Sequence, residues 1–358
     1  MKYKNVIVVL LFSLAIFLRF YCIEHQNIWF DESYSWDQTH NSIFQIIKYS
    51  AQWDVHPPLY YIILKYWISI LGDSTTGMRS LSLVFNIGTM FFVYLILKNQ
   101  KNTLTLFIAL LLMAVSPYQI YFSNETRMYS QLAFFNIASI YYYIKLYNND
   151  WQNKFHVFAF IIMTVFGLYT HLVAIITTGV LLVHFGYKVF IKSDTKVLRS
   201  YLTKRFILTL GGIALLFIPW LLVLWSFQAG NVGGQVWRAK IEIYEELYEV
   251  LRIFSVPFVG MYYWPKLNGF IICSIFLVLL PVSNFKAFKH KPIITLSVLA
   301  PLMLLLIALL VIRRQYDMAR YMFSLSPVVI ILFAFIIEES NKYIRPVVFV
   351  AVLLIYKQ

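Results

Sequence analysis

Charged residues are scarce in this chain. Asp, Glu, Lys and Arg make up only 13% of its 358 residues, whereas about a quarter of an ordinary soluble domain is charged. Hydrophobic residues make up 60%. This composition excludes a soluble globular domain and predicts an all-α protein that crosses the membrane many times. Acidic residues are scarcer than basic ones, with 16 Asp and Glu against 30 Lys and Arg.

The resulting net charge of +14 does not require a nucleic-acid partner. Lys and Arg of membrane proteins gather in the loops on the cytoplasmic side, by the positive-inside rule. We therefore expect the basic surplus to mark cytoplasmic loops, and we expect membrane lipids rather than nucleic acid as partners.

Cysteine is almost absent, and several chemical motifs are missing. Cys22 and Cys273 are the two cysteines, both near the predicted outer side. They either form a disulfide or stay unpaired, and the second reading is favoured. The sequence shows no Cys/His cluster of metal-binding type, no nucleophile elbow, no nucleotide P-loop and no internal repeat.

Long apolar runs dominate what remains. A span needs about 20 apolar residues, and the chain offers about eleven such runs. They fall near 5–21, 78–97, 103–122, 128–147, 155–170, 171–191, 205–227, 267–284, 293–312, 321–338 and 344–357. No small-residue cleavage site follows the first run, so we expect a retained signal-anchor helix.

The run from Pro58 to Leu71 is too short for a clear span, and we expect it to lie on the outer surface as a helix. With this segment outside, the Lys-rich loops fall on the cytoplasmic side. The outer face then collects loop 22–77, turn 123–130, loop 228–266 and segment 313–321. We expect one integral-membrane domain over 1–358, with no soluble domain after the last helix.

The first outer loop carries the most functional-looking residues. Asp31 and Glu32 are adjacent, and they are flanked by aromatic residues in the run NIWFDESYSW. Carboxylates beside aromatic rings at a membrane surface are costly to desolvate, which indicates chemistry. One acid would act as a base or nucleophile partner while the other binds a metal or orients a hydroxyl. The alternative is a solvated acidic loop.

Later in the same loop, Asp54 and His56 stand in front of Pro57 and Pro58. The prolines stiffen the backbone and favour an extended His56. Such a histidine near acids acts as a ligand or a proton carrier. The alternative is an exposed residue at the start of a helix. His171 is interpreted as a polar residue that caps a turn.

Several arginines fall on the outer face, against the positive-inside trend. They are Arg127, Arg313, Arg314 and Arg320, with Arg79 at the head of a helix. Guanidinium groups match the geometry of phosphate, so a lipid phosphate at the outer leaflet would explain them. The alternative is pairing with Glu125, Asp317 or lipid headgroups. Arg19 is expected to snorkel toward the interface.

These motifs together resemble the GT-C superfamily of integral-membrane glycosyltransferases. The nearest branch is that of the dolichyl-phosphate-mannose protein mannosyltransferases and the bacterial aminoarabinose and lipopolysaccharide-core transferases. The matching pieces follow in order: an apolar helix ending in Arg19, WFDE at 29–32, HPPLYY at 56–61, LG at 71–72, MRSLS at 78–82, SNETRMY at 123–129 and RYMFSLSP at 320–327.

The resemblance implies a GT-C-like bundle with juxtamembrane helices in the first outer loop. It also implies transfer of a hexose or pentose from a polyprenyl-phosphate donor on the extracytoplasmic face of the cell membrane. The acceptor would be a hydroxyl or phosphate of a lipid, glycan or protein.

The resemblance also assigns roles to residues. Asp31 would be the base that activates the acceptor, or the key catalytic carboxylate. Glu32 and His56 would orient it, or would hold a divalent metal together with Asp31. The residues that would hold the donor phosphate are Arg127, Tyr129, Arg313, Arg314 and Arg320.

Two other readings stay open. A transporter or flippase for lipid-linked sugars would place ionisable residues near mid-membrane and break its helices there. A catalytically inactive assembly partner is the third. The clustering of charge in outer loops favours the enzyme over the transporter, and the intact pair of Asp31 and Glu32 favours it over the inactive partner.

Overall fold

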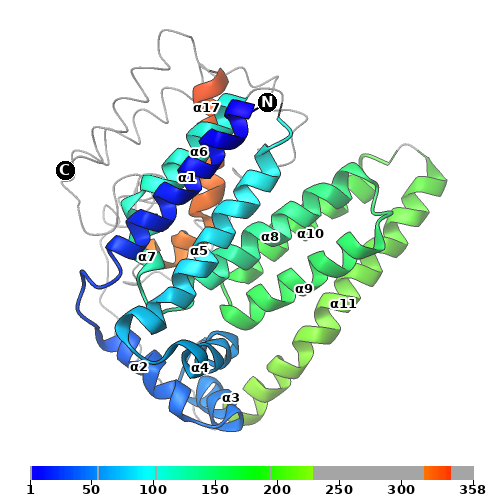
Figure 1. Ribbon diagram of the computed structural model, residues 1–358. Coiled ribbons are helices and arrows are strands. Elements are labelled where there is room, and N and C mark those ends of the chain that lie inside the picture. The colour runs from blue at the N-terminus through cyan, green and yellow to red at the C-terminus, as the bar shows by residue number, and fades with distance from the viewer. Residues whose placement is uncertain (1, 55, 101–102, 194, 229–317, 340–358) are drawn as a thin grey trace, which may run out of the picture.

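The described part of the chain is helical throughout. The computed structural model describes residues 2–54, 56–100, 103–193, 195–228 and 318–339 (Figure 1). The longer helices are α1 (Lys2–Tyr21), α5 (Thr75–Leu97), α8 (Tyr129–Asn148), α9 (Lys154–Thr170), α10 (Ala174–Phe190), α11 (Lys196–Gln228) and α17 (Ser326–Glu339). The shorter ones are α2 (Phe30–His40), α3 (Ile43–Gln52), α4 (Leu59–Leu71), α6 (Thr103–Val115), α7 (Pro117–Ser123), α16 (Met318–Met322) and the 3₁₀ helix η2 (Phe323–Leu325).

The first predicted outer loop folds into α2, α3 and α4, which gather at one end of the bundle (Figure 1). Helix α3 begins with a capping box, in which the Gln45 backbone N–H donates to the Ser42 hydroxyl and the Ser42 N–H donates to the Gln45 side chain. Helix α4 begins directly after Pro58 and ends at Leu71, and its C-cap is Gly72, whose φ of 82° favours glycine. The segment 58–71 is therefore a short helix, as predicted.

Four described helices are long and apolar enough to cross a membrane, or five if the bent pair α6–α7 is one span. Helices α8 and α9 lie within two residues of the predicted 128–147 and 155–170. The predicted spans at 267–284, 293–312 and 344–357 lie outside the described residues. The expected count of about eleven is thus not confirmed. Cys22 is unpaired, and Cys273 also falls outside the described part.

One helix prediction was wrong. The run 103–122 is not continuous, because α6 and α7 meet at a bend of 54°. Pro117 has no N–H for the carbonyl of Met113, and it drives Ser116 out of helical geometry, to ψ 120°. The hydroxyl of Ser116 then caps α7 by accepting from the Gln119 N–H.

The prediction for Arg19 was also wrong. Its side chain does not snorkel, because it is 0% exposed and donates to the carbonyls of Met113 and Ala114, at 2.7 and 3.1 Å. These are the carbonyls that the break at Pro117 leaves without a helical partner. Arg19 therefore stabilises the bend between α6 and α7.

Arg19 also begins a buried chain of hydrogen bonds. It donates to Asn86, Asn86 donates to Gln119, and Gln119 donates to Ser326, at 2.8, 3.0 and 2.6 Å. The four residues come from α1, α5, α7 and α17. Satisfied polar networks in a core specify one arrangement of the elements that they join. This chain of bonds therefore fixes α17 and the short helices before it against the N-terminal half.

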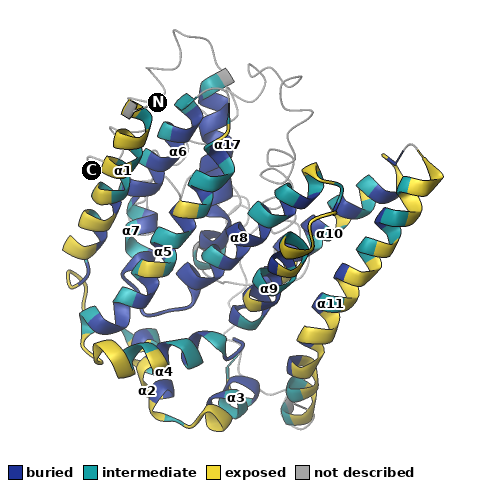
Figure 2. Cartoon of the chain, turned by 45° about the vertical axis from the view of Figure 1, so that its right-hand side comes forward, coloured by how far each residue is buried: buried dark blue, intermediate teal, exposed yellow. Residues whose placement is uncertain are grey.

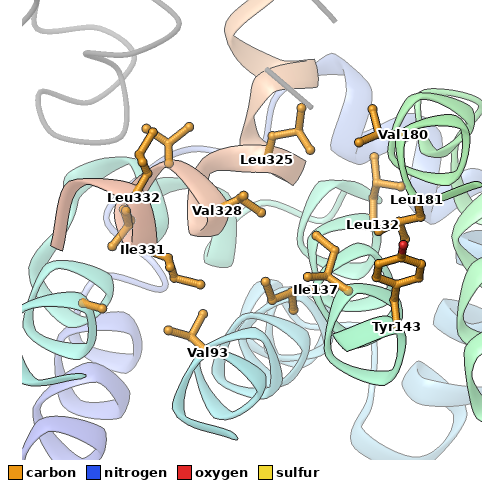
Figure 3. Packing of buried hydrophobic residues seen from close by; sticks show 14 of the residues in the cluster. Val93, Leu132, Ile137, Tyr143, Val180, Leu181, Leu325, Val328, Ile331 and Leu332 are labelled. Carbon is orange, nitrogen blue, oxygen red and sulfur yellow. The ribbon is translucent and has the colours of Figure 1, made fainter. Parts of the chain in front are cut away.

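Apolar packing completes the bundle. Helix α17 is largely buried, while α1 and α11 keep exposed flanks (Figure 2). Val328 and Ile331 of α17 belong to the same cluster as Val93 and Ile137 (Figure 3). A second, smaller cluster contains Tyr60, Tyr61, Tyr118, Phe122 and Phe323. The hydroxyl of Tyr61 in this second cluster donates a hydrogen bond to Asp54.

Candidate active site

Asp31 lies where three distant segments meet. It is the second residue of α2, and its Oδ2 accepts a hydrogen bond of 3.1 Å from Nη1 of Arg320 in α16. The Nε of Arg127, in the turn before α8, is 3.9 Å from the same oxygen. The Asp31 side chain keeps 25% exposure. Three of the sequence-predicted site residues thus meet around one accessible carboxylate.

Arg320 is held on both sides. The centre of its guanidinium group lies 4.4 Å from the ring centroid of Trp29, the residue before α2. Such stacking fixes the plane of a guanidinium group. Since the same group binds Asp31, the aromatic residue next to the acids positions the cation rather than only marking the membrane interface.

Arg127 is almost enclosed, with 5% exposure. Its Nη1 donates to the Asp31 carbonyl, the Ser35 hydroxyl and the Tyr61 hydroxyl, at 3.3 to 3.4 Å. Burial alone would lower the pKa of Arg127, but the surrounding phenols and carboxylates raise it above its usual value. Arg127 is therefore a fixed cation beside Asp31.

Glu32 is buried and forms an ion pair with Arg79. Both of its oxygens accept from Arg79, at 2.9 and 2.7 Å, and Oε1 also accepts from the Thr126 backbone N–H at 2.8 Å. Both charged side chains are 1% exposed. Arg79 donates further to the carbonyls of Ile23 and Gln26. The pair ties loop 22–32, α5 and the turn before α8 together, which neither sequence reading of Arg79 anticipated.

The divalent metal implied by the resemblance does not fit these residues. Both oxygens of Glu32 are bound by Arg79 and Thr126. Within the described ranges no group of three or more His, Cys, Asp or Glu side chains is placed to hold a metal ion. Asp31, Glu32 and His56 therefore do not form the metal site that the resemblance suggested.

Asp54 anchors the second half of the site. Its Oδ1 lies 2.6 Å from Nδ1 of His56, and its Oδ2 accepts from the Tyr61 hydroxyl at 2.6 Å. Burial raises the pKa of Asp54, but the bonds from His56 and Tyr61 outweigh burial and hold it at about 2. His56 is 8% exposed, so it is not the solvated residue of the alternative reading.

His171 joins this group from the turn between α9 and α10. The centroid of its ring lies 4.7 Å from that of His56, and its Nδ1 accepts from the Val173 backbone N–H at 3.0 Å. It therefore caps a turn, as predicted. Burial, followed by the nearby His56 and Arg127, lowers the pKa of His171 well below the usual value. Its apolar sequence context, LYTHLVA, gave no signal for the contact with His56.

Glu125 is the functional candidate that sequence reasoning missed. Both carboxyl oxygens are buried, and neither has a hydrogen-bond partner among the described residues. Burial raises its pKa to about 8 despite the nearby Arg320 and Arg127. Glu125 therefore carries a proton at neutral pH. In the sequence it had only been considered as an ion-pair partner for the outer arginines.

The remaining predicted residues divide into two groups. Tyr129 begins α8, is 3% exposed, and packs edge-on against Phe122 at 5.2 Å between ring centroids. Its ring is 6.4 Å from that of His171, so it borders the site. Arg313 and Arg314 lie outside the described residues.

Comparison with known proteins gives the fold class. No protein-family profile and no curated protein matches the sequence. Solved structures do match, and they are GT-C membrane glycosyltransferases. The chain thus has the GT-C fold, as the sequence resemblance implied. With its candidate spans, it is a multi-pass membrane protein.

Three matches give the extent of the likeness. ArnT from Cupriavidus metallidurans in the apo state matches with a TM-score of 0.64 at 12% identity, over 99% of this chain and 63% of that one. The oligosaccharyltransferase of Archaeoglobus fulgidus in the apo form matches with a TM-score of 0.56 at 13% identity, over 99% of this chain and 55% of that one. The archaeal oligosaccharyltransferase AglB from Archaeoglobus fulgidus, in complex with an inhibitory peptide and a dolichol-phosphate, matches with a TM-score of 0.54 at 12% identity, over 99% of this chain and 54% of that one. The chain therefore spans between about half and five-eighths of these proteins.

Proposed function

We propose that this protein transfers a sugar from a polyprenyl-phosphate donor to an acceptor hydroxyl or phosphate on the extracytoplasmic face of the membrane. The observation that carries the proposal is the accessible Asp31 carboxylate, flanked by Arg127 and Arg320 in a GT-C fold. The complex of the archaeal oligosaccharyltransferase with dolichol-phosphate supports a lipid phosphate as the donor group.

In the proposed reaction the acceptor oxygen attacks the anomeric carbon of the donor sugar. The bond between that carbon and the phosphate oxygen breaks, and its electron pair stays on the phosphate. The proton of the acceptor hydroxyl passes to Asp31, which acts as general base. Polyprenyl phosphate leaves with one more negative charge than it carried in the donor, so fixed cations at the phosphate stabilise the transition state.

Arg127 and Arg320 supply those cations in the proposal. Arg127 is held by the surrounding hydroxyl groups and carbonyl, and Arg320 is stacked on Trp29, so neither must reorganise extensively when charge develops. The resemblance adds Tyr129, Arg313 and Arg314 to the phosphate site.

Glu32 takes a positioning role rather than a reacting one. A base must reach the proton that it abstracts, and both Glu32 oxygens are already engaged by Arg79 and Thr126. Asp31 has the greater exposure, 25% against 1% for the Glu32 side chain. The vicinal acids thus divide labour, with Asp31 facing the substrate and Glu32 holding the loop.

One observation keeps the flippase as a second candidate. Helices α6 and α7 form a broken span with Arg19 buried at the break, and transporters use broken helices and intramembrane charge. However, Arg19 is two residues from the end of α1 at Tyr21. The break therefore lies toward the end of the bundle that carries α2 to α4, not at its middle.

An assay with labelled donors separates the two functions. Membranes that contain the protein would be offered polyprenyl phosphates carrying different radiolabelled sugars. The proposal expects the label to move to an acceptor and polyprenyl phosphate to be released. Labelled donor that crosses the bilayer intact, without release of polyprenyl phosphate, would favour the flippase and contradict the transferase.

A further inference from the structure

The proposed reaction leaves two imidazole rings without a role. His56 and His171 lie side by side, with ring centroids 4.7 Å apart and planes tilted by 56°. They are 8% and 5% exposed. Both Nε2 atoms are buried and have no hydrogen-bond partner among the described residues. Buried polar atoms in proteins are normally hydrogen-bonded, so this pair points to a bound group.

The other nitrogen of each ring fixes the hydrogen-bonding role of Nε2. The Asp54 carboxylate can only accept, so Nδ1 of His56 carries the proton in their bond of 2.6 Å. In neutral His56 the Nε2 is then an acceptor. In His171, Nδ1 accepts from the Val173 N–H, so its proton sits on Nε2, which is a donor.

The two histidines thus offer one hydrogen-bond acceptor and one donor, and this combination favours a particular kind of ligand. A phosphate or carboxylate would need donors alone, and a metal cation would need acceptors alone. Hydroxyl groups both donate and accept, and a sugar carries several on neighbouring carbons. The pair is therefore suited to two hydroxyl groups of one sugar.

The neighbours of His171 indicate which sugar. Its ring lies 5.3 Å from that of Tyr321, the residue after Arg320, and 6.4 Å from that of Tyr129. The donor sugar is bonded directly to the phosphate that Arg127 and Arg320 are proposed to hold. We propose that His56 and His171 form the hydroxyl-binding subsite for this donor sugar, an inference that rests on the proposed function.

A binding experiment tests the subsite without turnover. Purified protein in lipid nanodiscs would be titrated, with no acceptor present, with polyprenyl phosphate and with the same lipid carrying its sugar. The quantity of interest is the ratio of the two Kd values. His171→Phe should lower the preference for the sugar-bearing lipid by about fivefold, the worth of about one neutral hydrogen bond, and should leave the Kd of the bare lipid unchanged.

Two variants sharpen the result. His171→Gln keeps an N–H donor and should restore part of the preference for the sugar. His156→Phe alters a histidine in the first turn of α9, whereas His171 follows the last turn, and it should behave like the unmodified protein. A background with Cys22 and Cys273 replaced by serine keeps thiols from reacting during purification.

The possible outcomes are distinct. An unchanged sugar preference in His171→Phe would overturn the subsite and assign the two nitrogens to water. An equal loss for both lipids would also overturn it. If the unmodified protein binds both lipids equally, the subsite fails while a lipid-phosphate site stands. If it binds neither lipid, the proposed function fails, and the subsite fails with it.

Discussion

Arg320 donates a hydrogen bond of 3.1 Å to Asp31 across 289 positions of sequence. The contact joins the first predicted outer loop to a short helix near the end of the chain, and it brings the proposed base beside a proposed phosphate ligand. A charge-assisted hydrogen bond of this kind fixes the relative position of the two groups. Asp31 is thereby held next to the place where the donor phosphate would sit.

Replacing Arg320 should weaken donor binding more than acceptor binding. We expect Arg320→Ala to raise the KM for the donor about 10- to 100-fold, the range for loss of a charge-assisted hydrogen bond. The donor KM of Arg320→Lys should lie between those of the unmodified protein and Arg320→Ala, since lysine keeps the charge but lacks the planar group that stacks on Trp29. Steady-state kinetics with donor and acceptor varied in turn would measure both effects. An unchanged donor KM in the alanine variant would show that the phosphate role is wrong.

Breaking the pair of Glu32 and Arg79 should unfold the loop rather than only slow the reaction. Removing one partner of a buried ion pair costs about 3–5 kcal/mol, because a buried charge is left uncompensated. We expect Arg79→Ala and Glu32→Gln to lower the unfolding temperature clearly, and Arg199→Ala at an exposed position to leave it unchanged.

The double replacement Glu32→Leu with Arg79→Met provides the internal control. It removes both charges, so it should destabilise less than the sum of the single replacements. Unfolding in detergent, followed by circular dichroism, would give the comparison. Single variants that are as stable as the unmodified protein yet fully inactive would instead give Glu32 a direct catalytic role.

Glu125 should make stability depend on pH. Burial raises its pKa to about 8 in the folded protein, while an unfolded glutamate titrates near 4.3. Between these values the folded state keeps a proton that the unfolded state has released, so stability decreases as pH rises toward 8. The full contribution is present below about pH 4.3 and is lost above the folded pKa.

Glu125→Gln should remove this dependence, because glutamine stays neutral at every pH. Unfolding temperatures between pH 6 and 9 would be compared for Glu125→Gln, the exposed Glu24→Gln and the unmodified protein. We expect only Glu125→Gln to show a flatter profile. Parallel profiles for all three proteins would mean that Glu125 is ionised in the folded state.

The predicted orientation can be tested with single cysteines. Asp37→Cys lies on an exposed position of α2, and Lys204→Cys lies on an exposed position of α11, in a background with Cys22 and Cys273 replaced by serine. A membrane-impermeant maleimide added to intact cells should label position 37 at once and position 204 only after permeabilisation. The reverse pattern would overturn the topology and the extracytoplasmic reaction with it.

Sequence reasoning succeeded where the signal is local. Apolar runs of sufficient length located α8 and α9 closely, and the prolines before α4 marked its first turn. The acidic pair Asp31 and Glu32 was found because acids are rare in an apolar chain. These features depend on neighbours within a few positions, which a sequence displays directly.

It failed where the partner is distant. The ion pair of Glu32 and Arg79 spans 47 positions, and Arg19 binds carbonyls that are freed only because α6 breaks at Pro117. The burial of Glu125 depends on packing among segments that are far apart in the sequence. Each of these residues looked exposed or interfacial by its local context, and tertiary contacts reversed that interpretation.

The most direct test of the central claim is sugar transfer by Asp31→Asn, compared with Asp37→Asn on the same helix. Asparagine keeps the shape of Asp31 but cannot take a proton, so we expect transfer to fall by about 10²- to 10⁴-fold while donor binding persists. Asp37 is exposed and is not one of the proposed site residues, so its variant should transfer sugar normally. Near-normal transfer by a folded, membrane-inserted Asp31→Asn protein would contradict the account.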